Sequence, residues 1–230
     1  MKHQTTRGKI LYLRHGRETG REWFTITTHG DGQRTLRAYC EMDDHDLVRD
    51  VTYTVGRDWR PLDCFVRLTI HDKFVGSSWF RFADSLVECQ GFTATEGRFD
   101  QRYAVDRRPP SFGAHPIVCD MWHLSQFDRN GPRRQTLEGI FLSSPKPDGG
   151  SGPMLSRKNL TIEYLGKELL TVPAGTFEAD RFDFVLGAPH PANESLWCLG
   201  PDIIPLKVGY PIYDSTYELA ELQRGSSSSP

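Results

Sequence analysis

The sequence predicts an all-β protein that folds as an antiparallel meander barrel or a strongly curved sheet, with one short helix or loop insertion. Two observations support this fold class. Apolar and polar residues alternate with a period of two in successive segments, as side chains do across a strand. Turn sequences rich in Gly and Asp separate these segments at short intervals, which is typical of antiparallel barrels.

Length and composition indicate a single domain. The chain has 230 residues, of which 37% are hydrophobic and 11% aromatic. A chain of this size and composition can bury a substantial core. We therefore expect residues 1–224 to form one β-barrel domain, followed by a flexible Gly/Ser-rich tail at 225–230.

Charge and cysteine usage exclude some classes of function. A net charge of −2 argues against a nucleic-acid-binding polycation. There is no apolar run long enough for a membrane-spanning helix. The N-terminus lacks the charged-then-apolar pattern of a secretory signal. The five cysteines are widely spaced and form no CxxC, which is typical of reduced thiols in a cytoplasmic protein.

The first half of the chain carries the clearest strand patterns. At 62–71, Leu62, Cys64, Val66, Leu68 and Ile70 alternate with more polar positions. Gly30-Asp31-Gly32 predicts the first hairpin turn. The strands expected here, after a strand-like start, are 22–28, 33–42, 47–55, 61–71, 74–83 and 98–105.

Two stretches interrupt this pattern before the strands resume. Within 106–132, Pro116 predicts the start of a short helix that runs to Phe127. The Pro- and Gly-rich stretch 144–156 predicts a flexible surface loop. The later strands expected are 135–143, 158–165, 168–172, 176–186, 194–199, 204–210 and 213–222.

An Arg14-His15-Gly16 sequence follows the first strand-like segment, with Glu18 and Thr19 close behind. It resembles the opening motif of the histidine phosphatase superfamily. The resemblance implies that His15 is phosphorylated while Arg14 holds the phosphate. That fold alternates strands with helices, whereas the residues after His15 form a hairpin pattern. A surface histidine at the end of a strand is the alternative interpretation.

A second resemblance covers about 50 residues near the C-terminus. The sequence VPAGTF at 172–177 is followed by Trp197, by Ile204-Pro205-Leu206 and by Tyr217-Glu218-Leu219. This pattern resembles the bacterial β-protein family known as DUF3108. The resemblance implies a curved antiparallel, lipocalin-like barrel and no established chemistry. Pro173 and Gly175 also explain the turn without any ligand.

The predicted helix carries the strongest candidates for acid–base chemistry. Asp120 and His123 lie one turn apart on it, so they share a face. An aspartate can orient a histidine and raise its basicity, which suits a general base. We expect His123 as the base and Tyr103 or His115 as the proton donor. In the alternative, Asp120 pairs locally and Trp122 plugs the barrel. The histidine spacing predicts no metal site.

Aromatic and arginine residues on the polar faces of the strands are candidates for a ligand-binding interior. The candidates are Arg37, Tyr39, Tyr53, Phe65, Arg67, Trp79, Arg81 and Trp122. In the alternative, these faces meet solvent. The opposite face at 62–71 is apolar enough to be packed under a helix or loop instead of lining a cavity.

These observations lead to one main hypothesis and one alternative of a different class. The barrel binds a small apolar or aromatic molecule and performs cofactor-independent acid–base chemistry on it, as an isomerase, cyclase, hydratase or lyase. The alternative is a non-catalytic carrier or sensor of such a molecule. No nucleotide-binding glycine motif is present, so we expect no cofactor. The oligomeric state is open, and a homodimer is one option.

Overall fold

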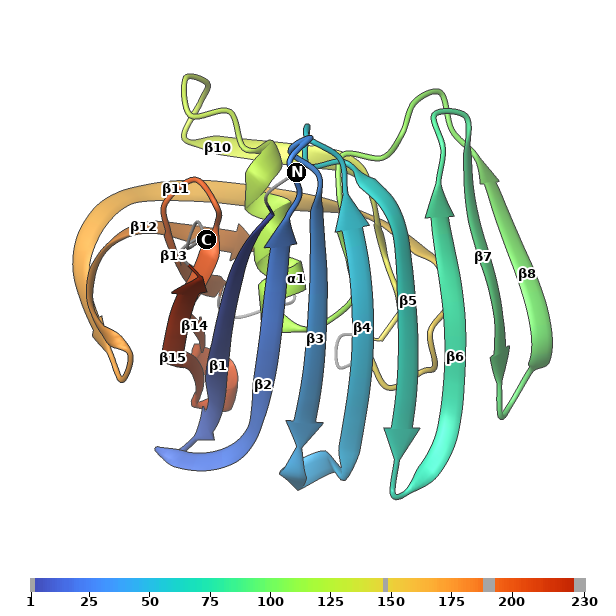
Figure 1. Cartoon of the computed structure of the whole chain (residues 1–230), viewed down its shortest axis with the longest axis horizontal. Coiled ribbons are helices and arrows are strands. Elements are labelled where there is room, and N and C mark those ends of the chain that lie inside the picture. Colours follow the sequence, from blue (N-terminus) through green and yellow to red (C-terminus); the bar gives the residue numbers. More distant parts are fainter. Residues whose placement is uncertain (1–2, 147–148, 188–192, 226–230) are drawn as a thin grey trace, which may run out of the picture.

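One curved sheet forms the whole framework of the protein. The computed structural model describes residues 3–146, 149–187 and 193–225. Within them, 15 strands lie in the order β8-β7-β6-β5-β4-β3-β2-β1-β15-β14-β13-β12-β11-β10-β9. All neighbouring strands are antiparallel except β9 and β10, which are parallel. Figure 1 shows a sheet that curves strongly around helix α1 without closing into a barrel.

The strands follow the predicted pattern closely, and they confirm the all-β fold class. They are β1 (Gln4–Arg14), β2 (Arg17–Thr28), β3 (Arg34–Met42), β4 (Leu47–Val55), β5 (Pro61–Ile70), β6 (Lys73–Phe82), β7 (Leu86–Thr93), β8 (Gly97–Ala104), β9 (Phe112–Gly113), β10 (Arg134–Leu142), β11 (Ser156–Val172), β12 (Gly175–Val185), β13 (Glu194–Leu199), β14 (Ile204–Tyr210) and β15 (Ser215–Gly225).

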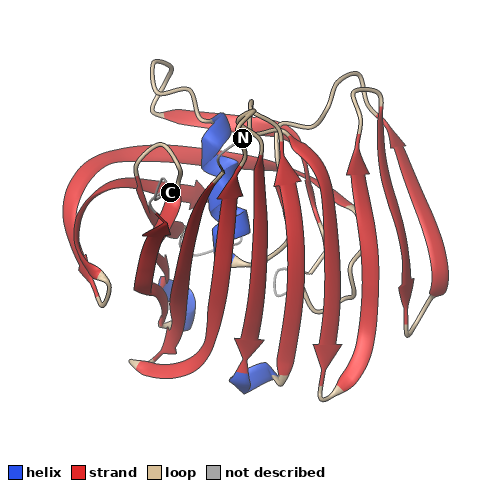
Figure 2. Cartoon of the chain, viewed as in Figure 1, coloured by secondary structure: helices blue, strands red, loops and turns tan. Residues whose placement is uncertain are grey.

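The helical segments are short. α1 (Ile117–Met121) continues directly into the 3-10 helix η2 (Trp122–Gln126), so the predicted helix after Pro116 is present. Two further 3-10 turns, η1 (Asp43–His45) and η3 (Pro211–Tyr213), lie at the sheet rim (Figure 2). Of the helical segments in the described residues, α1 and η2 lie on the concave side of the sheet, near its centre (Figure 1).

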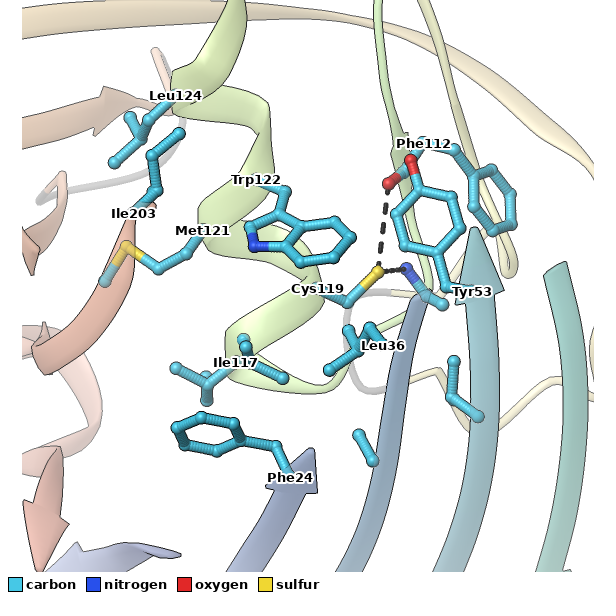
Figure 3. Packing of buried hydrophobic residues seen from close by; sticks show 14 of the residues in the cluster. Phe24, Leu36, Tyr53, Phe112, Ile117, Cys119, Met121, Trp122, Leu124 and Ile203 are labelled. Carbon is cyan, nitrogen blue, oxygen red and sulfur yellow. Dashed lines mark hydrogen bonds between the residues drawn. The ribbon is translucent and has the colours of Figure 1, made fainter. Parts of the chain in front are cut away.

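Alternate residues of the strands pack onto α1 from both halves of the sheet. Phe24 and Leu36 point toward Ile117 and Cys119, while the ring of Tyr53 packs against Trp122 in a tilted arrangement (Figure 3). The apolar residues at 62–71 lie on this inner face, with Cys64, Val66 and Leu68 buried. Cys64 and Val66 belong to the same hydrophobic cluster as Cys119 and Trp122. Burial of this area is the main force that holds the helix against the sheet.

Two strand predictions are corrected by the structure. The segments 158–165 and 168–172 form one strand, β11, because a bulge between Tyr164 and Gly166 bends it without ending it. Gly166 has a φ of 112°, which only glycine adopts at low cost. Strand β7 was not predicted, because its pattern is broken by Gln90 and Gly91.

Part of the predicted surface loop at 144–156 is tied to the sheet, and its residues 147–148 lie outside the described residues. The hydroxyl of Ser78 donates to the carbonyl of Pro153 at 2.6 Å. The backbone N–H of Leu155 donates to the side-chain oxygen of Gln101 at 2.7 Å. At the C-terminus, Gly225 still pairs with Thr5 in β1, and the rest of the predicted tail, 226–230, lies outside the described residues.

The described residues give two further general findings. All five cysteines are buried, and none of them forms a disulfide within the described part of the chain. Across the same residues, no helix has the length and apolar character needed to cross a membrane.

Candidate functional site

Helix α1 is anchored at its first turn by a side chain from the sheet. Its N-terminal residue, Pro116, provides no side-chain cap. Instead, the carboxylate of Glu22 on β2 accepts the backbone N–H groups of Ile117 at 2.7 Å and Val118 at 3.1 Å. The hydroxyl of Tyr12 donates to the same carboxylate at 2.6 Å. Glu22 thus satisfies N–H groups that the start of a helix leaves unpaired and fixes the helix against β2.

Asp120 of α1 and His123 of the 3-10 helix η2, which continues from α1, converge on Gly113 of β9. A methyl group added at Gly113 would lie 2.7 Å from Nε2 of His123 and 2.8 Å from Oδ1 of Asp120. It would also lie 2.8 Å from Leu142 on β10. Both polar atoms therefore approach the backbone of Gly113 so closely that a side chain at this position would not fit without a shift of its neighbours.

The partner of His123 differs from the predicted one. Its Nδ1 lies 2.5 Å from the hydroxyl of Ser111, a buried residue that precedes β9. Asp120 accepts the backbone N–H of His115 at 3.2 Å. No hydrogen bond or ion pair joins Asp120 to His123 within the described residues. The prediction that Asp120 orients His123 is therefore wrong, because the loop 111–115 supplies a partner to each.

A cavity of about 440 Å³ lies next to this pair. One wall is aliphatic and aromatic, and the other carries titratable groups. The apolar wall is formed by Ile140, Leu142, Leu160, Phe184, Leu186 and Ile212. The polar wall is formed by His115, Asp120, His123, Glu194, Tyr210 and Tyr213, with Lys146, Lys158, Asn159 and Asn193. A mostly apolar pocket with a few convergent polar groups is the usual form of a small-molecule site.

A second cavity of about 320 Å³ adjoins the first. His115, Asp120, Tyr210 and Tyr213 line both of them. The second cavity is further lined by Tyr12, Arg14, Met42, His45, Arg49, Ile117, Ser215 and Tyr217. We call the first the apolar chamber and the second the arginine chamber. Asp120 thus lies at the junction between the two chambers.

The two carboxyl groups of the apolar chamber hold their protons unusually strongly. Burial, with a smaller effect from Glu194, raises the pKa of Asp120 to about 8. Burial also raises the pKa of Glu194 to about 7, although the hydroxyl of Tyr210 donates to it at 2.7 Å and opposes the change. Near neutral pH, Asp120 is mainly the neutral acid, so it is able to donate a proton to a bound molecule.

Burial shifts the pKa values of the two histidines in this chamber downward. Burial lowers the pKa of His123 to about 4. Burial, together with Arg49 and His123, lowers the pKa of His115 to about 3. Both rings are therefore neutral at pH 7, and each has one nitrogen able to accept a proton. The chamber holds a proton donor and proton acceptors side by side, in their uncharged forms.

Most residues predicted to bind a ligand lie on the opposite, outer face of the sheet. Arg37, Tyr39, Phe65, Arg67, Trp79 and Arg81 are exposed there and reach neither chamber. Tyr53 and Trp122 face inward but are packed in the core, 1% and 2% exposed. The polar strand faces meet solvent because the apolar faces are needed to cover α1. The alternative interpretation, that these strand faces meet solvent, is therefore correct.

Two other predicted residues lie outside the chambers. Tyr103 on β8 is partly buried and packs edgewise on Phe141, so it is not placed to donate a proton beside His123. His15 lies in the turn between β1 and β2, where its Nδ1 is 2.6 Å from a carboxylate oxygen of Asp214. The antiparallel sheet around His15 lacks the strand–helix alternation that the phosphatase resemblance implied.

Three charged residues at this site were not predicted from the sequence. Glu22, Arg49 and Glu194 each fall in register with buried apolar residues of their strands. On β4, for example, Arg49 lies between the buried residues Leu47 and Val51 and is itself only 3% exposed. A charged residue at an inward position is unusual, because burial of a charge is costly. That departure from the strand pattern is the signal that could have identified them.

No group of three or more His, Cys, Asp or Glu side chains is placed to hold a metal ion among the residues with described positions. The polar groups of the chambers are instead arranged around space that an organic molecule could occupy. These groups can form hydrogen bonds and transfer protons.

Comparison with known proteins identifies the fold only. No protein-family model matches the chain, and no curated protein matches it. The structure is similar to that of a β-barrel-like protein of the domain of unknown function DUF1849 from Brucella abortus, with a TM-score of 0.55, 10% identity and coverage of 97% and 98% of the two chains. The comparison with a DUF1089 family protein from Pseudomonas aeruginosa gives a TM-score of 0.47 and a sequence identity of 11%. The match covers 84% of this chain and 90% of the other. The chain therefore has a β-barrel-like fold, shared with a protein whose domain has no known function.

Proposed function

We propose that this protein binds a small, mostly apolar or aromatic molecule in the apolar chamber and transfers a proton on it without a cofactor. The convergence of Asp120 and His123 on Gly113, at the wall of a largely apolar cavity, is the observation that carries the proposal. The reaction class is isomerisation, cyclisation, hydration or elimination. All of these need a positioned acid, a positioned base and shelter from water.

The roles of the residues follow from their partners and charges. His123 is the base, and the hydroxyl of Ser111 holds its Nδ1, which leaves Nε2 toward Gly113. Asp120 is the acid, since burial keeps its carboxyl protonated near neutral pH. His115 and Glu194 are within the same chamber and are a second base and acid. The apolar wall formed by residues such as Leu160 and Phe184 holds the body of the molecule.

The exchange of acidic C–H protons tests this function directly. 2-Acetylnaphthalene is a small aromatic ketone whose methyl protons exchange with D₂O when a base removes one of them and an acid supports the oxygen. We expect the protein to accelerate this exchange, followed by proton NMR. His123→Ala and Asp120→Asn should each slow it at least tenfold, since general acid–base groups typically contribute about 10²–10⁴-fold. Phe65→Ala, on the outer face, is the matched control and should leave the rate unchanged.

The same experiment separates the enzyme from the carrier or sensor. Binding of 2-acetylnaphthalene without acceleration of exchange, in wild type as in the variants, would support the carrier and contradict the enzyme. Absence of binding, measured by calorimetry, would contradict both. Exchange that survives in both variants would show that Asp120 and His123 are not its acid and base.

Two further proposals concern family and location. The turn at Pro173 and Gly175 and the strand with Trp197 support a relationship to the DUF3108 family, on the sequence pattern described above. Five buried cysteines without a disulfide among the described residues support a cytoplasmic location. Fractionation of cells that express the tagged chain tests the location, and recovery from the periplasm or medium would contradict it.

A further inference from the structure

Two segments of the chain repeat one short sequence pattern. The first is HGRETGREWF at 15–24, and the second is HDKFVGSSWF at 71–80. Both begin with His, have a basic residue at the third position and Gly at the sixth, and end in Trp-Phe. The first segment runs through the turn between β1 and β2 into β2, and the second runs through the turn between β5 and β6 into β6. The sheet therefore contains two copies of one hairpin pattern.

The two copies also share their local structure. Nδ1 of His15 lies 2.6 Å from a carboxylate oxygen of Asp214, and Nδ1 of His71 lies 3.0 Å from one of Asp46. The backbone N–H of each histidine donates to the backbone carbonyl of the same aspartate, at 3.0 Å and 2.9 Å. All four residues have φ between 46° and 51°. The repeated histidine thus has a structural role, since it closes the turn.

The repeated Trp-Phe pair is different, because packing explains only its phenylalanine. Phe24 and Phe80 point inward and are 3% and 0% exposed. Trp23 and Trp79 point to the outer face of the sheet, where they are 38% and 44% exposed. A ring that stays this exposed contributes only part of its hydrophobic stabilisation. A tryptophan at the same outward position of both hairpins therefore indicates a surface that contacts another molecule.

A groove of about 720 Å³ surrounds Trp79 on the outer face of the sheet. It includes the ring of Phe92, which is 50% exposed. Gln90 lies opposite Trp79 on β7 and donates to Asp100 on β8 at 3.2 Å. Arg98 and Asp100 are the charged residues among those that line the groove, so its charges balance. The groove thus combines exposed rings with hydrogen-bonding groups of both kinds.

The second tryptophan belongs to a similar arrangement. Trp23 lies opposite Tyr39 on β3, with ring centroids 5.8 Å apart. The ammonium group of Lys9 lies 5.6 Å from the Trp23 ring, and the hydroxyl of Tyr39 donates to Glu41 at 3.1 Å. Four strand spacings separate β2 from β6, so at about 4.8 Å each the two tryptophans are about 19 Å apart along the sheet.

We infer that the outer face of the sheet binds an uncharged oligosaccharide, which lies across the strands with sugar rings stacked on Trp79 and Trp23. A sugar ring has a face of C–H groups, which packs on an aromatic ring, and a rim of hydroxyl groups. The hydroxyls both donate and accept hydrogen bonds, so they suit a mixed set of partners such as Gln90, Arg98 and Asp100.

The charge of the groove favours this occupant over a single-stranded nucleic acid. Bases also stack on exposed rings, but the phosphates of the strand require a surplus of positive charge along the groove. One basic and one acidic residue line the groove beside Trp79, which leaves no such surplus there. Neither Trp23 nor Trp79 lines a chamber, so this inference is independent of the proposed function.

Calorimetry on the full chain tests the inference with three uncharged probes, namely cellohexaose, maltohexaose and N-acetylated chitohexaose. We expect at least one of them to bind. Trp79→Ala and Trp23→Ala should each weaken that binding about tenfold, because each removes one stacked ring, whereas Trp79→Phe should retain most of it. Leu169→Ala removes an exposed apolar side chain from β11 and is the matched control, which should bind as wild type does.

Four results would overturn the inference. The first is that none of the three probes binds to wild type. The second is binding of equal strength in both alanine variants, which would place the sugar elsewhere. The third is tighter binding of single-stranded oligodeoxythymidine than of any hexasaccharide, which would assign the face to a nucleic acid. The fourth is self-association of wild type in light scattering that Trp79→Ala abolishes, which would assign the face to a second copy of the chain.

Discussion

The carboxylate of Glu22 accepts the backbone N–H of Ile117 at 2.7 Å, and the two residues are 95 positions apart in the sequence. This contact joins β2 in the first half of the sheet to α1, which carries Asp120 and continues into η2 with His123. It also replaces the side-chain cap that α1 lacks. The position of the candidate site therefore depends on a buried carboxylate that lies in a different part of the chain.

We predict that Glu22→Ala lowers the free energy of unfolding by about 3 kcal/mol, because it leaves two backbone N–H groups and the hydroxyl of Tyr12 without an acceptor. Glu22→Gln keeps one carbonyl oxygen and should lose roughly half as much. Chemical denaturation measures both values. Glu178→Ala removes a carboxylate from the exposed pair with Lys167 and should change stability little. Equal stability of Glu22→Ala and wild type would contradict the anchoring role.

The glycine at position 113 gives a second prediction. Gly113→Ala places a methyl group between His123, Asp120 and Leu142, at distances that atoms do not normally reach. We expect a loss of about 1–3 kcal/mol in stability, as for other overpacked sites, and a loss of proton exchange on 2-acetylnaphthalene. Gly209→Ala is a matched strand control, since its methyl group would lie 3.7 Å or more from its neighbours. Normal exchange activity in Gly113→Ala would contradict the roles of Asp120 and His123 as acid and base.

The raised pKa of Asp120 predicts a pH dependence of stability. The folded protein keeps this proton up to about pH 8, whereas an unfolded aspartate loses it near about pH 3.9. Because the native state binds more protons in this window, stability falls as pH rises, by at most about 1.4 kcal/mol per pH unit for one group. Asp120→Asn should make the decline between pH 7 and pH 8 shallower, as measured by denaturation at each pH.

Stability should be compared between pH 7 and pH 8 because, below pH 7, the two buried histidines make stability rise with pH and oppose the effect of Asp120. Burial lowers the pKa values of His115 and His123, so the unfolded state binds more protons at acid pH and stability rises with pH there. That contribution ends near the unfolded histidine pKa of about 6.5. Asp106→Asn, at an exposed position, is the control. An unchanged slope in Asp120→Asn would contradict the assignment of a raised pKa to this residue.

Ser111 should act on His123 without contacting a ligand. Its hydroxyl lies 2.5 Å from Nδ1 of His123 and fixes the ring. We predict that Ser111→Ala costs about 1–2 kcal/mol in stability because it leaves a buried ring nitrogen without a partner. Nitrogen-15 NMR of the His123 ring should show a neutral tautomer at pH 6 in wild type and a change in tautomer balance in the variant. Identical ring spectra would mean that Ser111 does not hold the histidine.

The strand pattern of the sequence was enough to predict the fold, but not the orientation of its faces. Alternation at 33–42 and 62–71 located strands whose apolar residues, such as Leu36 and Val66, are buried. The inward direction became clear only from α1, because the apolar faces needed a partner and the short helix provides it. Phe65 and Trp79 were consequently assigned to an interior, whereas they are exposed on the outer face.

The sequence predicted the part of the candidate site whose residues are close together in the chain, but not the part that distant strands contribute. Asp120 and His123 are three residues apart, so the spacing of one helical turn was sufficient to group them, and His115 lies just before the predicted helix. Arg49 and Glu194 reach the same cavities from β4 and β13, and such long-range proximity is set by the curvature of the sheet. The partner of His123 was missed because Ser111 precedes the helix in an irregular segment without a periodic pattern.

The most direct measurement of the central claim is a map of amide chemical-shift changes when 2-acetylnaphthalene is added to the isotope-labelled full chain. A molecule in the apolar chamber should shift the amides of Gly113, Asp120, Leu142 and Phe184 most strongly. Shifts confined to Phe65, Trp79 and Phe92 on the outer face, or no shifts at all, would contradict the claim that this chamber is the site of function.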